Sequence, residues 1–202
     1  MSKSRSRRDS NLRRHIAYLA ARMMAEDGIT DYGTAKTKAA RQAGLGDSAL
    51  LPDNHEIEEA LREYQGLYQK DDQPLHLRRL REVAVKVMRE FGDFRPALVG
   101  SVLTGTAGQF SDVNLQLFTD DSKLLTMFLL NRHYRFEEGS KKVRRGDRLD
   151  AVPQISLEVE DVTVTFTVLD PGDERSTPRA RADPGEMPLR ARLAEVEALL
   201  ER

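Results

Sequence analysis

Residues 97–118 constrain the fold of this chain more than any other segment. A β-rich run over residues 97–103 contains Gly100-Ser101, and a second run over residues 113–118 follows Ser111-Asp112. The second run alternates apolar and polar residues, which is typical of a half-buried strand. The segment therefore predicts a strand, a glycine-bearing loop and a second strand whose residues 112 and 114 point to the same side.

The rest of the C-terminal half also reads as strands and helices. Residues 154–159 and 162–169 are rich in β-branched residues and predict a hairpin that turns near Glu160-Asp161. Residues 122–132 have a helical pattern of leucines, and residues 189–202 predict a closing helix. Residues 170–188 hold four prolines and predict a loop or linker.

The N-terminal half predicts four helices over residues 11–91. The first ends at Gly28, and the second spans about residues 31–42 with a face of small residues, Ala35, Ala39 and Ala43. The third begins after Asp53, whose spacing to Glu56 is that of a capping box. The fourth follows Pro74 and stops at Gly92.

Helices followed by a β-rich half indicate an α+β fold. We expect a mixed β-sheet of four or five strands with helices on one face, and an N-terminal helical subdomain alongside it. The predicted parts are a flexible tail over residues 1–10, a helical subdomain over 11–92 and an α/β domain over 95–202. The tail is rich in serine and arginine, so a nucleic-acid-binding arm is the alternative interpretation.

Composition excludes several classes of protein. The chain has 202 residues, of which 39% are hydrophobic, so it can bury a core. Its net charge of −1 points to no particular partner, and the absence of cysteine excludes disulfides and thiolate metal sites. No apolar run approaches the ~18 residues of a membrane span, and no signal peptide is evident. We expect a cytoplasmic protein that has no membrane partner.

The layout of Gly100-Ser101 and Ser111-Asp112-Val113-Asn114 resembles the nucleotidyltransferase superfamily related to DNA polymerase beta. The resemblance implies that Gly100, Ser101 and Ser111 bind a nucleoside triphosphate. It also implies that Asp112 and Asn114 are catalytic and that Asp112 ligates Mg²⁺. The whole chain is similar to a group of bacterial proteins that pair a helical N-terminal part, with an element like residues 51–58, with a degenerate-looking nucleotidyltransferase domain.

The sequence departs from the superfamily pattern at two carboxylates. Asn114 stands where the second carboxylate is expected, and the run over residues 162–169 contains no acid to supply the third. Thr165 matches the third position best, while Asp161 and Asp170 lie at the ends of the run. We expect a lone carboxylate to bind Mg²⁺ poorly, since two-metal sites need bridging carboxylates.

Three functions follow as hypotheses. The first is an enzyme that transfers a nucleoside monophosphate from a nucleoside triphosphate to an unknown acceptor, such as a protein or an RNA. The second is a catalytically inactive nucleotide-binding or regulatory module on the same fold. An interaction protein that works through residues 11–91 is a third.

Other candidate residues have plainer interpretations. Tyr64 and Tyr68 are one helical turn apart, which suits helix packing as well as a platform for bases. The four histidines form no zinc pattern. A basic cluster suits either a phosphate-binding surface or a solvated loop; it comprises Lys141, Lys142, Arg144, Arg145 and Arg148.

Overall fold

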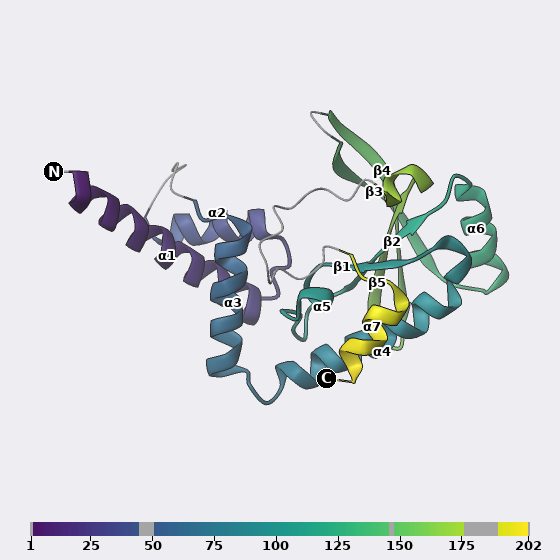
Figure 1. Ribbon diagram of the computed structural model, residues 1–202, viewed down its shortest axis with the longest axis horizontal. Helices are drawn as coiled ribbons and strands as arrows, with labels where there is room; N and C mark the ends of the chain where they lie inside the picture. The colour runs from purple at the N-terminus through teal and green to yellow at the C-terminus, as the bar shows by residue number, and fades with distance from the viewer. Residues whose placement is uncertain (1, 45–50, 146–147, 176–189, 202) are drawn as a thin grey trace. The chain divides into compact units, whose positions relative to one another are not determined.

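The computed structural model describes residues 2–44, 51–145, 148–175 and 190–201, and their side chains from residue 9 onward except those of 144, 145 and 148. These residues form α-helices, two short 3-10 helices and one mixed sheet (Figure 1). The chain divides into two compact units. The first comprises Met1–His76 and Thr106–Ser111, and the second comprises Leu77–Gly105 and Asp112–Arg202.

The first unit is helical. It contains α1 (Ser2–Glu26), α2 (Tyr32–Gln42) and α3 (Asn54–Tyr68), as well as the loop Thr106–Ser111. Residues 2–10, expected as a flexible tail, continue helix α1.

Polar side chains start two of these helices, and the sequence predicts the cap of the second of them, α3. The Asp31 carboxylate accepts a hydrogen bond of 2.7 Å from the Thr34 N–H at the start of α2. Asp53 and Glu56 form the predicted capping box of α3. Such caps satisfy backbone N–H groups that have no partner within the helix, so they fix where each helix begins.

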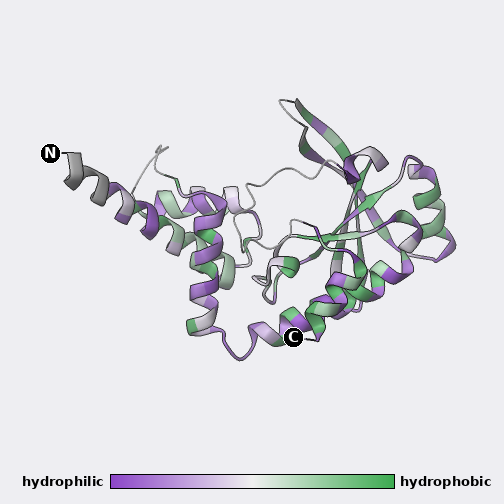
Figure 2. Cartoon of the chain, viewed as in Figure 1, coloured by the Kyte–Doolittle hydropathy of each residue, from purple (hydrophilic) through white to green (hydrophobic). Residues whose placement is uncertain are grey.

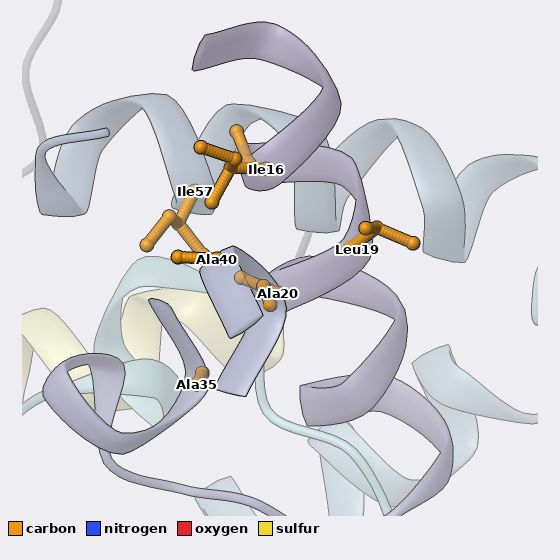
Figure 3. Close-up of a cluster of buried hydrophobic side chains, with 8 residues drawn as sticks. Ile16, Leu19, Ala20, Ala35, Ala40 and Ile57 are labelled. Carbon is orange, nitrogen blue, oxygen red and sulfur yellow. The ribbon is translucent and has the colours of Figure 1, made fainter. Parts of the chain in front are cut away.

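Small residues bring α1 and α2 close together in the core of the first unit. Ala20, Ala35 and Ala40 are buried there beside Ile16 and Ile57, as Figure 3 shows. Of the predicted small face of α2, Ala35 and Ala39 are fully buried and Ala43 is partly buried against the same cluster. The prediction of that face is therefore confirmed.

The second unit contains a five-stranded mixed sheet with the order β1-β2-β5-β4-β3. The pairing of β2 with β5 is parallel, and the other three pairings are antiparallel. The predicted α+β class and mixed sheet are confirmed, at the upper strand number. The strands are β1 (Ala97–Val99), β2 (Val113–Phe118), β3 (Phe136–Arg145), β4 (Arg148–Val159) and β5 (Val162–Leu169).

Two strands differ from the prediction. The run over residues 97–103 is not one strand, because β1 stops at Val99 and residues Ser101–Thr104 form the short helix α5. The strands β3 and β4 pair over ten residues, so Lys141 and Lys142 lie exposed on a strand of a long hairpin rather than in a loop. The side chains of the other three members of the basic cluster lie outside the described residues.

One face of the sheet is apolar and is covered by helices. Phe166 of β5 lies 4.7 Å, between ring centroids, from Phe91, which directly follows α4 (Gln73–Glu90). Phe91 lies 5.0 Å from Phe128 of α6 (Ser122–Asn131) in the same way, so α4 and α6 share this face. The hydrophobic residues of α6 are green in Figure 2.

The C-terminal segment adds an edge to the sheet. Ala191 pairs with Leu98 of β1 through two backbone hydrogen bonds of 2.8 and 2.9 Å. Helix α7 (Leu193–Leu200) follows and is joined to α4 by the ion pair of Arg89 and Glu197. Within the described part of the chain, no helix has the length and apolar character needed to cross a membrane.

Candidate functional site

The second face of the sheet is lined by polar side chains. The backbone pairing aligns Asn114 of β2 with Thr165 of β5, Thr165 with Ser156 of β4, and Ser156 with Glu137 of β3. Residues that pair across strands point to the same face, so these four side chains form one row across the sheet. The other end of this face is apolar, where Ala97, Phe118, Val152 and Leu169 form a buried cluster, so we take the polar row as the candidate site.

Gly100 shapes the turn at one end of this face. It directly follows β1 with φ 76° and ψ −157°, a region of backbone conformation that is essentially restricted to glycine. A Cβ placed on Gly100 would lie 3.9 Å from Asn114 Cβ and Nδ2, which is ordinary van der Waals contact. The backbone conformation, rather than lack of space, therefore requires glycine here.

Ser101 and Asp112 belong to the same end of the sheet. Val99 pairs with Asn114 in the antiparallel β1–β2 ladder, so the chain that leaves β1 passes the chain that enters β2. Ser101 is the first residue of α5, two residues past Val99, and Asp112 is two residues before Asn114. The strand pairing thus places both residues at the same end of the sheet.

Asp112 is a half-buried carboxylate. Burial raises its pKa above the ordinary value for aspartate. Within the described residues, no lysine, arginine or histidine side chain forms an ion pair with it. A carboxylate that is partly desolvated and unpaired in this way favours a cationic ligand, which would offset the cost of its burial.

Asn114 and Thr165 supply neutral groups beside this carboxylate. The Asn114 side-chain amide donates to the Asp112 carbonyl over 3.4 Å, within its own strand. Thr165, the expected third position, is indeed the cross-strand partner of Asn114, and only 7% of it is exposed. Its hydroxyl lies 3.2 Å from the Ser156 hydroxyl. These contacts engage the Asn114 amide nitrogen and the Thr165 hydroxyl, at positions where a two-metal site would have carboxylates.

At this end of the sheet Asp112 supplies one carboxylate, while Asn114 and Thr165 supply neutral groups. Magnesium is commonly held by one or two carboxylates together with the phosphates of a nucleotide, and Asp112 can supply one carboxylate. No group of three or more aspartate, glutamate or histidine side chains in the described segments is placed to hold a metal ion. Asp161 and Asp170 lie at the ends of β5 and are exposed.

Ser111 is placed differently from the other predicted residues. It belongs to the loop of the first unit, where its hydroxyl oxygen accepts a hydrogen bond of 3.1 Å from the Gly108 N–H. The Gln65 side chain anchors the same loop by donating to the Thr106 carbonyl over 2.9 Å. The structure thus gives the Ser111 hydroxyl a local role in this turn.

Two arginines cover the far end of the polar face. The guanidinium carbons of Arg190 and Arg192 each lie 5.2 Å from the centre of the Phe118 ring, at the end of β2. Arg190 also donates to Gln116 Oε1 over 2.5 Å, across β1. Ala97 of β1 is buried and is the cross-strand partner of Gln116. Burial lowers the pKa of Arg190, with Arg192 adding to the effect.

An open pocket lies on the same face, beside Thr163 of β5 and along β4 and the start of β3. Its volume is about 830 Å³, within the range of small-molecule sites, and Thr163, Ser156, Glu158 and Glu137 contribute to its lining. Since Ser156 is the partner of Thr165 in the polar row, the pocket adjoins the row that contains Asn114.

The sequence analysis missed the β4 contribution to this face. The signal was present, because residues 154–159 alternate Gln, Ser and Glu with apolar residues. An alternating strand has one polar face, and its parity gives Ser156 and Glu158 the same side. Which strand lies beside β5 follows only from the pairing.

Comparisons with known proteins add no identification. No known protein family matches the chain, and neither a curated protein nor a solved structure matches it. The functional argument therefore depends on the site itself.

Proposed function

We propose that this protein binds a nucleoside triphosphate, together with one Mg²⁺, at the end of the polar face formed by Gly100, Ser101 and Asp112. The protein would act as a nucleotide-binding or regulatory module of the nucleotidyltransferase type. The observation that carries the proposal is the half-buried carboxylate of Asp112, which has no ion-pair partner among the described residues, beside a turn whose backbone conformation favours glycine. Such a turn lets a phosphate approach the backbone closely.

Each residue has a distinct role in the proposal. The Ser101 hydroxyl would donate to a phosphate oxygen, and the backbone at Gly100 would lie against the phosphates. Asp112 would hold Mg²⁺, which would offset the charge of the triphosphate. Asn114 and Thr165 are neutral, so a second metal that activates an attacking hydroxyl has no carboxylate ligand there. This donor set favours binding over transfer.

Transfer of a nucleoside monophosphate to an acceptor is the second candidate. It is favoured by the pocket of about 830 Å³ on the same face, which offers room for an acceptor such as a protein side chain or an RNA end. Asp112 would be needed for this activity as well, so binding and transfer must be measured separately.

Titration calorimetry with each nucleoside triphosphate, with and without Mg²⁺, tests binding. We expect binding that depends on Mg²⁺ and that weakens at least about ten-fold in Asp112→Asn, equivalent to roughly 1.4 kcal/mol. Asp120→Asn is the matched control, because Asp120 is exposed just beyond the opposite end of β2. Equal affinities of the wild type and Asp112→Asn, or no heat with any nucleotide, would contradict the proposal.

Incubation of the protein and cell extract with nucleotides labelled at the α-phosphate tests transfer. Labelling of any macromolecule that is lost in Asp112→Asn and kept in Asp120→Asn would identify a transferase. Nucleotide binding without such labelling supports the binding module.

A further inference from the structure

Three tyrosines form a row where α1 and α3 meet in the first unit. The ring centroids of Tyr18 and Tyr64 are 5.9 Å apart, and those of Tyr64 and Tyr68 are 4.7 Å apart. Tyr64 is buried, and its hydroxyl donates to Glu26. The outer rings are different, because Tyr18 is 40% exposed and Tyr68 is 65% exposed. Helix packing accounts for Tyr64 but does not require exposed aromatic rings on both sides of it.

Basic residues flank this row along α1. Arg14 and Arg22 lie four residues on either side of Tyr18, which places all three on one face of the helix. Arg14 is exposed, and the charge of Arg22 acts on the Tyr18 hydroxyl. Glu26 is engaged by the Tyr64 hydroxyl, and the exposed residues Lys70, Asp71 and Asp72 follow Tyr68 in the sequence.

The sequence continues this basic character toward the start of α1. Residues 2–14 contain six lysine or arginine residues and a single acid, Asp9, although the whole chain has a net charge of −1. Positive charge is therefore concentrated on this helix, and the remainder of the chain is net acidic. A local excess of this kind attracts a polyanion.

We propose that the surface formed by Arg14, Tyr18, Arg22 and Tyr68, here named the tyrosine surface, binds single-stranded nucleic acid. Bases would stack on the two exposed rings, and phosphates would pair with Arg14 and Arg22. Stacking on aromatic side chains within a positively charged surface is the general means of binding single strands. An acidic protein partner would account for the arginines but not for the exposed rings. The inference lies in the first unit and goes beyond the proposed nucleotide site.

Fluorescence anisotropy of the full-length protein with labelled oligonucleotides tests this inference. The probes are oligouridine, oligodeoxythymidine and a duplex of the same length, each titrated in about 50 mM and about 200 mM salt. The chain has five tyrosines and no tryptophan, so quenching of its intrinsic emission gives a second, label-free measure of stacking. We expect both single strands to bind more tightly than the duplex, because their bases are free to stack on the exposed rings.

Two variants separate the stacking and charge contributions. Tyr68→Leu keeps an apolar side chain at an exposed position and should weaken single-strand binding by about 5- to 100-fold. Arg14→Gln should reduce the slope of log affinity against log salt by about one. Lys38→Gln removes an exposed charge from α2 of the same unit and is the matched control, for which we expect less than about a two-fold change.

The inference is overturned if neither single strand binds in about 50 mM salt. It is also overturned if duplex and single strand bind equally and Tyr68→Leu has no effect on affinity. Equal weakening of binding by Lys38→Gln and Arg14→Gln would overturn it as well. If polyglutamate displaces the oligonucleotide equally well from the wild type and from Tyr68→Leu, the surface binds an acidic protein partner instead. That result would also overturn the inference. Circular dichroism confirms that each variant keeps its helices, so a lost affinity can be assigned to the surface.

Discussion

Replacement of Gly100 by alanine tests whether the turn at the candidate site depends on glycine. The backbone of Gly100 has φ 76° and ψ −157°, and a residue with a side chain costs about 1–3 kcal/mol in that region. Steric repulsion adds nothing to this cost, because the atoms nearest to an added Cβ lie 3.9 Å away. The expected loss of unfolding free energy is therefore about 1–3 kcal/mol, all of it from the backbone.

Urea and thermal denaturation followed by circular dichroism measure this loss. For a protein of this size, about 1–3 kcal/mol corresponds to a fall in Tm of roughly 2–12 °C. Gly92→Ala is the control in the same unit, because an added Cβ there meets no atom within 4 Å and its φ is not positive. We expect that control to stay within about 0.5 kcal/mol of the wild type.

The outcome separates three cases. A Gly100→Ala protein as stable as the wild type would show that the turn does not need glycine, and the reasoning about close phosphate approach would fail with it. A loss well above about 5 kcal/mol would mean that the added methyl group clashes. A loss within the expected range, with nucleotide affinity also reduced, supports both the strained turn and the site built on it.

Four further predictions concern the site and the cores. In Asp112→Asn the unfolding free energy should exceed that of the wild type at pH 7 and converge with it at acidic pH, as urea titrations at several pH values would show. The sign follows because burial raises the folded-state pKa of Asp112, so stability falls as pH rises from the unfolded value through the folded one. Tyr64→Phe should lose about 1.5–3 kcal/mol with its hydrogen bond to the Glu26 carboxylate, measured by the same titration. Phe91→Ala should lose about 3–5 kcal/mol, since Phe91 is fully buried among aromatic rings, and a smaller loss would show that the core relaxes around it. The pair Asn114→Asp with Thr165→Asp should lower Tm in a chelator and recover it in Mn²⁺ by differential scanning fluorimetry; no recovery would mean that the three positions do not converge on one metal.

Local features of the fold could be predicted from the sequence. The capping box of Asp53 and Glu56 and the turn at Glu160-Asp161 are set by residues within three positions of one another. Both turn residues have positive φ, 52° and 63°, as a tight turn between antiparallel strands requires. Such features depend on neighbouring residues alone, so a local pattern is sufficient to find them.

The end of β1 could not be placed in this way. Glycine occurs both within strands and in turns, so Gly100 inside an apolar run did not show that the strand stops at Val99. The length of the β3–β4 hairpin was also missed, because charged residues such as Lys141 and Lys142 are found in loops as often as on exposed strands. In both cases the outcome depends on pairing with distant residues.

The candidate site depends on both kinds of information. Asp112 and Asn114 were chosen because their segment resembles the nucleotidyltransferase superfamily, and their spacing predicts that they share a face of the strand. Ser156 joined them only through the pairing of β4 with β5. The neutral character of Asn114 was visible at once, but the engagement of the Thr165 hydroxyl with a second hydroxyl was not.

The division of the chain has a consequence for how such a protein could be shortened or recombined. Neither unit is continuous, because Thr106–Ser111 belongs with the first unit while the residues on both sides of it belong with the second. Deletion of residues 1–76 would remove Gln65 and Gln73, whose side chains hold the Thr106 and Ala107 carbonyls of that loop, and would strip Phe110 of its contact with Gly28. A genetic crossover between residues 76 and 106 would separate the six loop residues from their partners in the first unit, and one between residues 111 and 112 would divide the second unit. The two units are therefore expected to be inherited and expressed as a single piece.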